Sequence, residues 1–414
     1  MKKKAYFSFL IFLLLIFFVI RREKVLLIIL FTLPIVTLFL DKFKIKYSSF
    51  FKLYFSFWLY YMFISLINIF LNFSYYKLNS LVSLLFNFII VLAVFINIPK
   101  EYFSLKKYFI IFRNFGCILT IFGMCEFIIK KSIFYNIAKV DAINWQLSAF
   151  GTNNFRIFTL FLHPIVYGSF LSVLFWIKYN YPIKNFYLNK FFTILILINI
   201  YATQSRSCWI ALVITLVINL LFSNKISLGN FYKKKNNINI YIILFIGIIL
   251  IFIFREFLIN VFIQIINRFN IVFDLNINDG SRTQRVGAIK NILAFVNEKP
   301  IGMFIGFGSG YARTFMENNP VNLGFNIVDN QYFTLLLETG FIGIVLFLSP
   351  IFILIKNIKK IMNDKINRTL ALSIFSLYIT LFFFEGVGWQ TILYLVTFFI
   401  LTIDIKRENL EEVK

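Results

Sequence analysis

The chain has 414 residues, of which 60% are apolar, 20% are aromatic and only 14% are charged, and its mean hydropathy is +0.82. A water-soluble domain carries about a quarter charged residues, so this composition excludes one. The formal net charge of +24 would suggest nucleic acid in a soluble protein, but here the position of the basic residues matters more than their sum. We therefore expect no nucleic-acid partner.

Apolar residues occur in runs of roughly 15 to 25 positions separated by short basic stretches, which is the pattern of repeated transmembrane helices. This pattern predicts an all-α, polytopic membrane protein with twelve transmembrane helices. The first run follows three lysines as a secretory signal would, but no small-residue cleavage site comes after it, so we predict an uncleaved membrane helix. The seventh predicted span, 191–202, is short, and we expect its helix to begin near Phe186. The predicted spans are 5–20, 25–40, 53–71, 80–98, 108–129, 157–177, 191–202, 207–222, 239–254, 330–355, 369–384 and 390–404.

The basic residues of the connecting segments predict the orientation. With the N-terminus inside, the density of Lys and Arg in the inner segments is more than twice that in the outer ones, as the positive-inside rule requires. We therefore expect a multi-pass protein with both termini in the cytoplasm. The predicted parts are helices 1–9 at 1–254, an extracytoplasmic loop domain at 255–329, and helices 10–12 with a cytoplasmic tail at 330–414.

The outer loop of about 75 residues is too long to be a mere turn, and such loops are more often functional than not. It begins with an apolar stretch at 257–269, which we expect to lie along the membrane surface. Asp279, Gly280 and Ser281 then predict the start of a helix that ends at Lys299-Pro300. One side of this helix is apolar and carries Val286, Ile289, Leu293 and Val296.

Ionisable residues inside the predicted spans are few, namely Arg113, Glu126, Glu338 and Asp404. Arg113 and Asp404 lie close enough to span ends to snorkel, and Glu126 is near the outer end of its helix. Ion-coupled transporters usually need several ionisable groups near mid-membrane, so this distribution argues against a transporter.

Arginines recur at the predicted outer membrane boundary. Arg156 opens the sixth span, Arg206 opens the eighth, and Arg282 and Arg285 open the loop helix. The last two are three positions apart on one helix face, at the helix end whose free N–H groups favour an anion. Fork-shaped arginines suit a diphosphate better than lysines do. The alternative is that these are ordinary arginines flanking spans.

Several short segments, read in order, carry a resemblance to a known family. They are Arg156-Ile-Phe-Thr-Leu-Phe-Leu-His163-Pro164, Thr203-Gln-Ser-Arg206-Ser207, Asp279-Gly-Ser-Arg282, Lys299-Pro300 with Gly302, Gly306, Gly308 and Gly310, Val328-Asp329-Asn330-Gln331-Tyr332, and Leu337-Glu338-Thr339-Gly340-Phe341-Ile342-Gly343. The series resembles the O-antigen ligase and polymerase superfamily, which handles undecaprenyl-diphosphate-linked glycans on the outer face of the bacterial membrane. Recognisable motifs cover about 155 to 345.

The series also departs from that family. The ligase branch usually has histidine before Asn330, where this chain has Asp329, and this favours a polymerase. The family often has Gly after the Ser-Arg pair and Asn after the His-Pro pair, where this chain has Ser207 and Ile165. The arginines remain in place.

Two acidic residues are the predicted catalytic residues. Asp329 lies just outside the tenth span, where a carboxylate can accept a proton from a sugar hydroxyl, and Glu338 lies about two and a half turns deeper. Capping of the helix by Asp329 is an equally good interpretation. For Glu338 a structural role, bonding a neighbouring helix, is the preferred interpretation, with Thr339 and Gly343 at a spacing that lets helices approach.

His163 and Tyr332 are candidate substrate contacts. His163 is the only histidine and precedes Pro164, so a local break in the helix would expose it, although lone membrane histidines more often serve packing. The series Gly306-x-Gly308-x-Gly310 does not open a β-α-β unit, so a dinucleotide site is excluded and a turn is preferred. The same glycines also suit a close approach of the backbone to a phosphate.

The resemblance implies a plasma-membrane glycosyltransferase that polymerises undecaprenyl-diphosphate-linked repeat units into a surface polysaccharide such as O-antigen or capsule. It implies no cofactor and no metal, the lipid bilayer and lipid-linked oligosaccharides as partners, and a flippase and a chain-length regulator as further partners. Arg156, Arg206, Arg282 and Arg285 would bind the diphosphate, and Asp329 would be the base. Competing hypotheses are a ligase that transfers finished glycan, and a lipid-linked oligosaccharide flippase or other transporter.

Overall fold

The computed structural model describes residues 2–21, 49–97, 102–134, 155–223, 280–322 and 326–403. Across these ranges the protein is all-helical and contains no strand, which agrees with the predicted class. The predicted spans 25–40 and 239–254, the stretch 257–269, Asp279 and Asp404 lie outside the described residues, as does the side chain of Arg282.

Four helices are long and apolar enough to cross a membrane: α3 (Ser49–Leu71), α4 (Tyr75–Asn97), α5 (Tyr102–Ile129) and α16 (Gln331–Lys356). Shorter apolar helices accompany them, so the chain is a membrane protein, while the count of twelve spans stays a prediction. The remaining elements are α1 (Lys2–Arg21), η2 (Thr159–Phe161), α8 (Pro164–Asn180), α9 (Phe186–Ala202), α10 (Arg206–Phe222), α13 (Gly280–Glu298), α14 (Pro300–Ile305), α15 (Tyr311–Asn318), α17 (Ile358–Asn363), α18 (Lys365–Leu381) and α19 (Gln390–Thr402).

Two predicted spans differ in their bounds or continuity from the helices of the structure. The seventh is longer than drawn, because α9 begins at Phe186 as expected, capped by the Asn185 side chain, which accepts from the Leu188 N–H at 3.1 Å. The sixth is interrupted: only Thr159–Phe161 form a short 3-10 helix, and α8 begins at Pro164. Proline lacks an N–H and has a fixed φ that suits the first helical position, so it starts a helix here and does not continue one.

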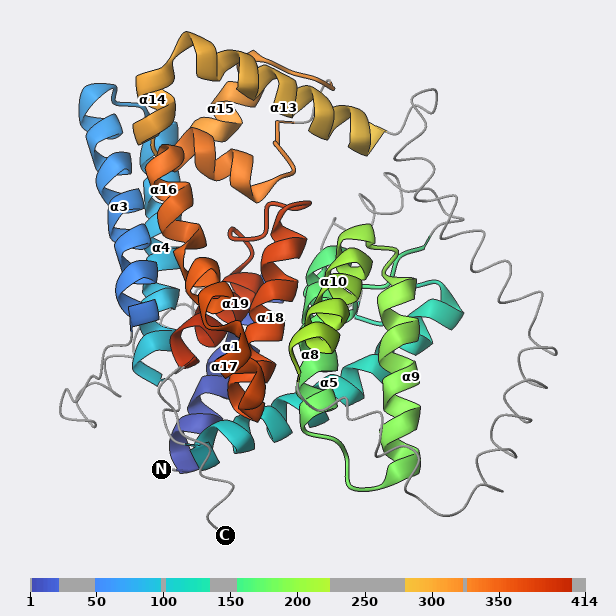
Figure 1. Cartoon of the computed structure of the whole chain (residues 1–414). Helices are drawn as coiled ribbons and strands as arrows, with labels where there is room; N and C mark the ends of the chain where they lie inside the picture. Colours follow the sequence, from blue (N-terminus) through green and yellow to red (C-terminus); the bar gives the residue numbers. More distant parts are fainter. Residues whose placement is uncertain are drawn as a thin grey trace.

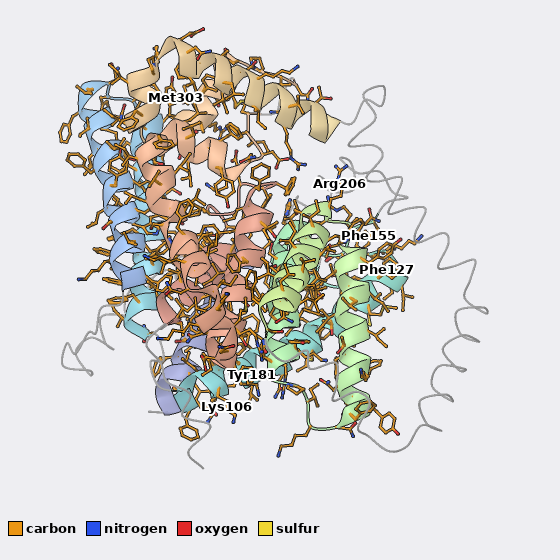
Figure 2. The ribbon with its side chains drawn as sticks, in the orientation of Figure 1. Lys106, Phe127, Phe155, Tyr181, Arg206 and Met303 are labelled. Atoms are coloured by element: carbon orange, nitrogen blue, oxygen red, sulfur yellow. The ribbon has the colours of Figure 1, made fainter. Side chains whose placement is uncertain are left out.

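The helical bundle is held by a continuous core of aromatic and aliphatic side chains. Helices α3, α4 and α16 lie on one side, α8, α9 and α10 lie on the other, and α1, α18 and α19 pass between them (Figure 1). Side chains fill the spaces between these helices (Figure 2). Tyrosines buried in this core keep polar partners: the hydroxyls of Tyr108 and Tyr394 lie 3.1 Å apart, and Tyr54 and Thr397 lie at the same distance.

Helices α13, α14 and α15 cover one end of the bundle, opposite the end where α1 begins (Figure 1). They bury a second, smaller apolar cluster against α16, which includes Ala288, Ile292, Met303, Phe315 and Leu337. The helix expected between 280 and 299 is therefore present as α13.

Only part of the apolar side predicted for α13 packs. Val286 and Leu293 are exposed and Ile289 is half-buried, whereas Val296 packs against the smaller cluster that contains the buried Ala288 and Ile292. Small residues let the buried face approach its neighbours: a Cβ on Gly287 would lie 2.4 Å from the Val321 side chain. Close packing at small residues thus helps to decide which face of α13 is buried.

A break in α16 allows a loop to pair with it. At Gly340 the backbone is left-handed (φ 66°), and the Leu337 and Glu338 carbonyls accept the N–H groups of Phe307 and Gly308, each at 2.9 Å. Gly306 has φ 102°, and a Cβ there would lie 2.5 Å from the Thr339 carbonyl carbon. The glycine series predicted to form a turn does so, and its close approach is to the α16 backbone.

Candidate functional site

Asp329 stands at the entrance to α16 in an unusual backbone conformation. Its φ is +57°, in the left-handed region that non-glycine residues rarely adopt. The N-cap of α16 is Asn330, whose side-chain oxygen accepts from the N–H groups of Tyr332 and Phe333 at 3.0 and 3.3 Å. The interpretation of Asp329 as the helix cap is therefore wrong, and its carboxylate is left for another role.

That carboxylate is paired with Arg285 from α13. The guanidinium donates to Asp329 Oδ2 through Nε at 2.7 Å and Nη2 at 2.6 Å, and both side chains remain partly exposed, by 24% and 19%. Within the described ranges, no hydrogen bond reaches Asp329 Oδ1. One oxygen is thus held in place while the other can accept a proton from a bound hydroxyl.

The electrostatic environment of Asp329 combines burial with positive charge. Burial raises the pKa of its carboxyl above the ordinary value, while Arg285 and then Arg156 lower it. A raised pKa makes an ionised carboxylate a better proton acceptor, provided that it is still ionised at working pH. Arg156 therefore lies close enough to act electrostatically on the same group that Arg285 binds.

Glu385, in the turn between α18 and α19, fixes the backbone of Asp329. It was not predicted as a site residue. Glu385 Oε1 accepts from the N–H groups of Val328 at 2.8 Å and Asp329 at 3.0 Å, and from the Thr334 hydroxyl at 2.8 Å. Burial raises the pKa of the Glu385 carboxyl, against these hydrogen bonds. An acidic residue inside an otherwise apolar turn was the available sequence signal.

Arg156 is positioned by the turn between α9 and α10. Its Nε donates to the Thr203 carbonyl at 2.8 Å, and the Ile157 N–H donates to the Ala202 carbonyl at 3.3 Å. The segment that follows Arg156 is anchored by Glu126 of α5, which is fully buried and accepts from the Phe158 and Thr159 N–H groups at 3.3 and 2.9 Å. Glu126 therefore serves the backbone next to Arg156.

Arg206 is the first residue of α10, just after the turn that binds Arg156. Figure 2 shows it at the end of α10 nearer to α13, with Tyr181 and Lys106 toward the opposite end of the molecule. Arg156 and Arg206 thus flank one turn, while Arg285 reaches Asp329 from α13. Arg282 lies one helical turn before Arg285 in α13.

His163 lies at the expected break in the chain. It is the N-cap of α8, with its Nδ1 accepting from the Ile165 N–H at 3.2 Å. Its ring stacks on Phe384, with centroids 4.7 Å apart, and lies 5.2 Å from the Trp389 ring. His163 therefore packs against the same α18–α19 turn that carries Glu385.

Glu338 and Tyr332 of α16 both make contacts within the protein. Glu338 is buried; its Oε2 accepts from the Tyr61 hydroxyl, and its Oε1 accepts from the Gly310 N–H at 2.8 Å. The Tyr332 hydroxyl donates to the Tyr378 carbonyl at 2.7 Å and so joins α16 to α18. At Gly343, the nearest atoms to an added Cβ belong to Thr339 of the same helix.

No group of three or more His, Cys, Asp or Glu side chains with the arrangement of a metal site occurs in the part of the chain that the structure describes. The ionisable groups around Asp329 are the guanidinium of Arg285, which contacts its carboxylate, that of Arg156, which acts on its pKa, and the carboxyl of Glu385, which accepts from its backbone N–H. The two guanidinium groups are the ones that can attract an anionic group beside Asp329.

Residues 191–348 match the family model described as O-antigen ligase. The match confirms the resemblance to the O-antigen ligase and polymerase superfamily, whose members act as membrane glycosyltransferase-like enzymes. It includes Arg206, Arg285, Asp329 and Glu338, while Arg156 and Glu385 lie outside it. No curated protein matches the chain.

Proposed function

Given this similarity to the O-antigen ligase family, we propose that the protein polymerises undecaprenyl-diphosphate-linked repeat units into a surface polysaccharide at the outer face of the plasma membrane. The observation that carries the proposal is the pairing of Asp329 with Arg285, with Arg156 close enough to lower the pKa of the same carboxyl. These contacts support the proposal of an anion site and a base side by side.

In the proposed reaction, a hydroxyl of one lipid-linked repeat unit attacks the anomeric carbon of the growing glycan on another. The new glycosidic bond forms as the bond to the lipid diphosphate breaks, and the hydroxyl proton passes to Asp329 Oδ1. Arg285, Arg156, Arg206 and Arg282 stabilise the negative charge that develops on the leaving diphosphate. Permanently charged guanidinium groups supply this stabilisation, so the proposed reaction is independent of a metal.

Glu338 has a positioning role in this proposal. Both of its oxygens are bound by groups of the protein, and the Gly310 N–H links it to the glycine loop beside α16. His163 and Tyr332 are proposed as contacts of the saccharide, because they border the α18–α19 turn and the start of α16. The protein is proposed to work with a flippase and a chain-length regulator.

The test in cells is the replacement of Arg206 or Arg282 by Ala. We expect long glycan chains to disappear while the protein stays at its normal level in the membrane, because the leaving diphosphate loses a cation. Long chains persisting at normal protein level would reject the diphosphate role. The purified protein in nanodiscs, given lipid-linked repeat units alone, should produce a ladder of longer lipid-linked glycans.

A ligase is the second candidate, because the matching family model is itself described as O-antigen ligase. A ligase would transfer the finished glycan to a separate lipid or cell-wall acceptor. In the nanodisc assay a polymerase leaves its product on the lipid diphosphate, whereas a ligase needs the added acceptor and labels it. Product found only on the acceptor would select the ligase.

A further inference from the structure

A cavity of about 240 Å³ lies beside the Asp329 site and was not expected from the sequence. It is enclosed by α3, α4 and α16, by the glycine loop at 306–310, and by the α18–α19 turn. Ser83 of α4 and Gly388 of the turn line it and are exposed, so its opening lies between these two elements.

Three of the four residues that α4 contributes to the wall are polar, although the helix is otherwise strongly apolar. Ser80, Ser83 and Asn87 all line the cavity, at positions i, i+3 and i+7, which share one helix face. Polar side chains within a membrane-spanning helix usually face the protein interior or a polar cavity, and mark function. This polar face of α4 therefore suits contact with a polar ligand.

One buried hydroxyl in the wall has no partner. Ser309 is 8% exposed, and among the described residues its Oγ has no hydrogen-bond partner. Ser309 lines the cavity. Leaving a buried polar group unpaired costs about 1–3 kcal/mol, so a ligand that accepts hydrogen bonds here is favoured.

The side chains of the wall offer no cation to an anion. Its acidic side chains are Glu338 and Glu385, and no Lys, Arg or His lines the cavity as the structure describes it. All three hydrogen bonds to Glu385 from described residues reach Oε1, which leaves Oε2 as an acceptor. A diphosphate would find no positive partner here, whereas hydroxyl groups can donate to these oxygens.

We propose that this cavity binds one neutral sugar ring of the lipid-linked glycan, with its hydroxyls donating to Glu385 and accepting from Ser309. The volume is below the roughly 300–1,000 Å³ of pockets for drug-sized ligands, so it suits one ring. Glu385 holds the Asp329 backbone with one oxygen and meets the sugar with the other. This assignment rests on the proposed function and names its saccharide subsite.

The experiment places the full chain in nanodiscs and measures saturation-transfer-difference NMR with methyl glycosides. The probes are neutral methyl hexosides, methyl N-acetylhexosaminides and methyl glucuronide. The blocking variant is Ser83→Trp, which fills the opening of the cavity. The matched control is Val82→Trp, which inserts the same side chain at an adjacent position that is 57% exposed and does not line the cavity.

We expect at least one neutral glycoside to bind, the glucuronide to bind at least tenfold more weakly, and Ser83→Trp alone to abolish the signal. Absence of binding by every neutral glycoside, equal signals in the two Trp variants, or preference for the glucuronide would overturn the assignment. Displacement of the glycoside by Na⁺ or Mg²⁺ at millimolar concentration would also overturn it, since it would identify a cation site.

The same variants assayed with lipid-linked repeat units separate this assignment from the proposed function. Glycoside binding that depends on Ser83, in a protein that neither extends nor transfers glycans, would retain the sugar subsite and reject the enzyme. Glycan extension that survives Ser83→Trp at the rate of Val82→Trp would retain the enzyme and reject the subsite.

Discussion

Arg285 and Asp329, 44 positions apart in the chain, meet in a contact in which two guanidinium nitrogens lie 2.6 and 2.7 Å from one carboxylate oxygen. The other oxygen receives no hydrogen bond from the described residues. The pair therefore orients a carboxylate and keeps one acceptor available.

Asp329→Asn should abolish glycan extension while leaving substrate binding nearly intact. The amide keeps the shape of the side chain but cannot take the hydroxyl proton, and a general base contributes about 10²- to 10⁴-fold to a rate. Turnover of lipid-linked repeat units by purified variants measures this, with the melting temperature as a control for folding. An Asn variant with turnover within threefold of the parent would show that Asp329 is not the base.

The pH dependence of turnover should have an acidic limb that reports Asp329. Activity requires the ionised form, so it falls as pH drops through the pKa of this carboxyl, which burial raises. Arg285→Gln removes the positive charge that lowers the pKa of Asp329 most, so this pKa rises and the acidic limb should move to higher pH. The measurement is the rate as a function of pH for both proteins. A limb that moves to lower pH contradicts the assignment.

Replacing Glu126 should destabilise the protein and disturb Arg156 together. Glu126→Leu leaves the N–H groups of Phe158 and Thr159 without their acceptor, at a cost on the order of 1–3 kcal/mol each. Glu126→Gln keeps one acceptor oxygen and should recover much of the loss. Thermal unfolding in nanodiscs compares the two variants. Equal melting temperatures for parent and Leu variant would exclude an anchoring role.

Gly340→Ala should strongly destabilise the fold, whereas Gly388→Ala should be nearly neutral. Gly340 has φ 66°, and an added Cβ would lie 2.4 Å from the Phe304 carbonyl oxygen, where backbone cannot easily yield. At Gly388, nothing lies within 4 Å of such a Cβ. With ψ at −173° the backbone of Gly340 lies in a region that is essentially restricted to glycine, which costs an alanine on the order of 1–3 kcal/mol even without the clash. Thermal unfolding of both variants tests this, and similar melting temperatures would show that the break in α16 is dispensable.

Hydropathy along the chain was sufficient to find most helices of the bundle, because burying an apolar run in lipid or protein depends on composition over a long window. The start of α9 at Phe186 and the break before Pro164 were also predictable, since a capping Asn and a proline act locally. The arginines and Asp329 could be selected one by one because charges at membrane boundaries are conspicuous.

Which of these residues meet was decided only by tertiary packing. The Arg285 and Asp329 contact depends on how α13 lies over α16, and α13 presents the face of Ala288 and Ile292, because close packing at small residues helps to decide which face is buried. The role of Glu385, an isolated acid in an apolar turn, appears only once that turn lies beside the backbone of Asp329. These contacts require atoms to lie within a few ångströms of each other, and the number of residues between two positions in the chain does not tell whether they do.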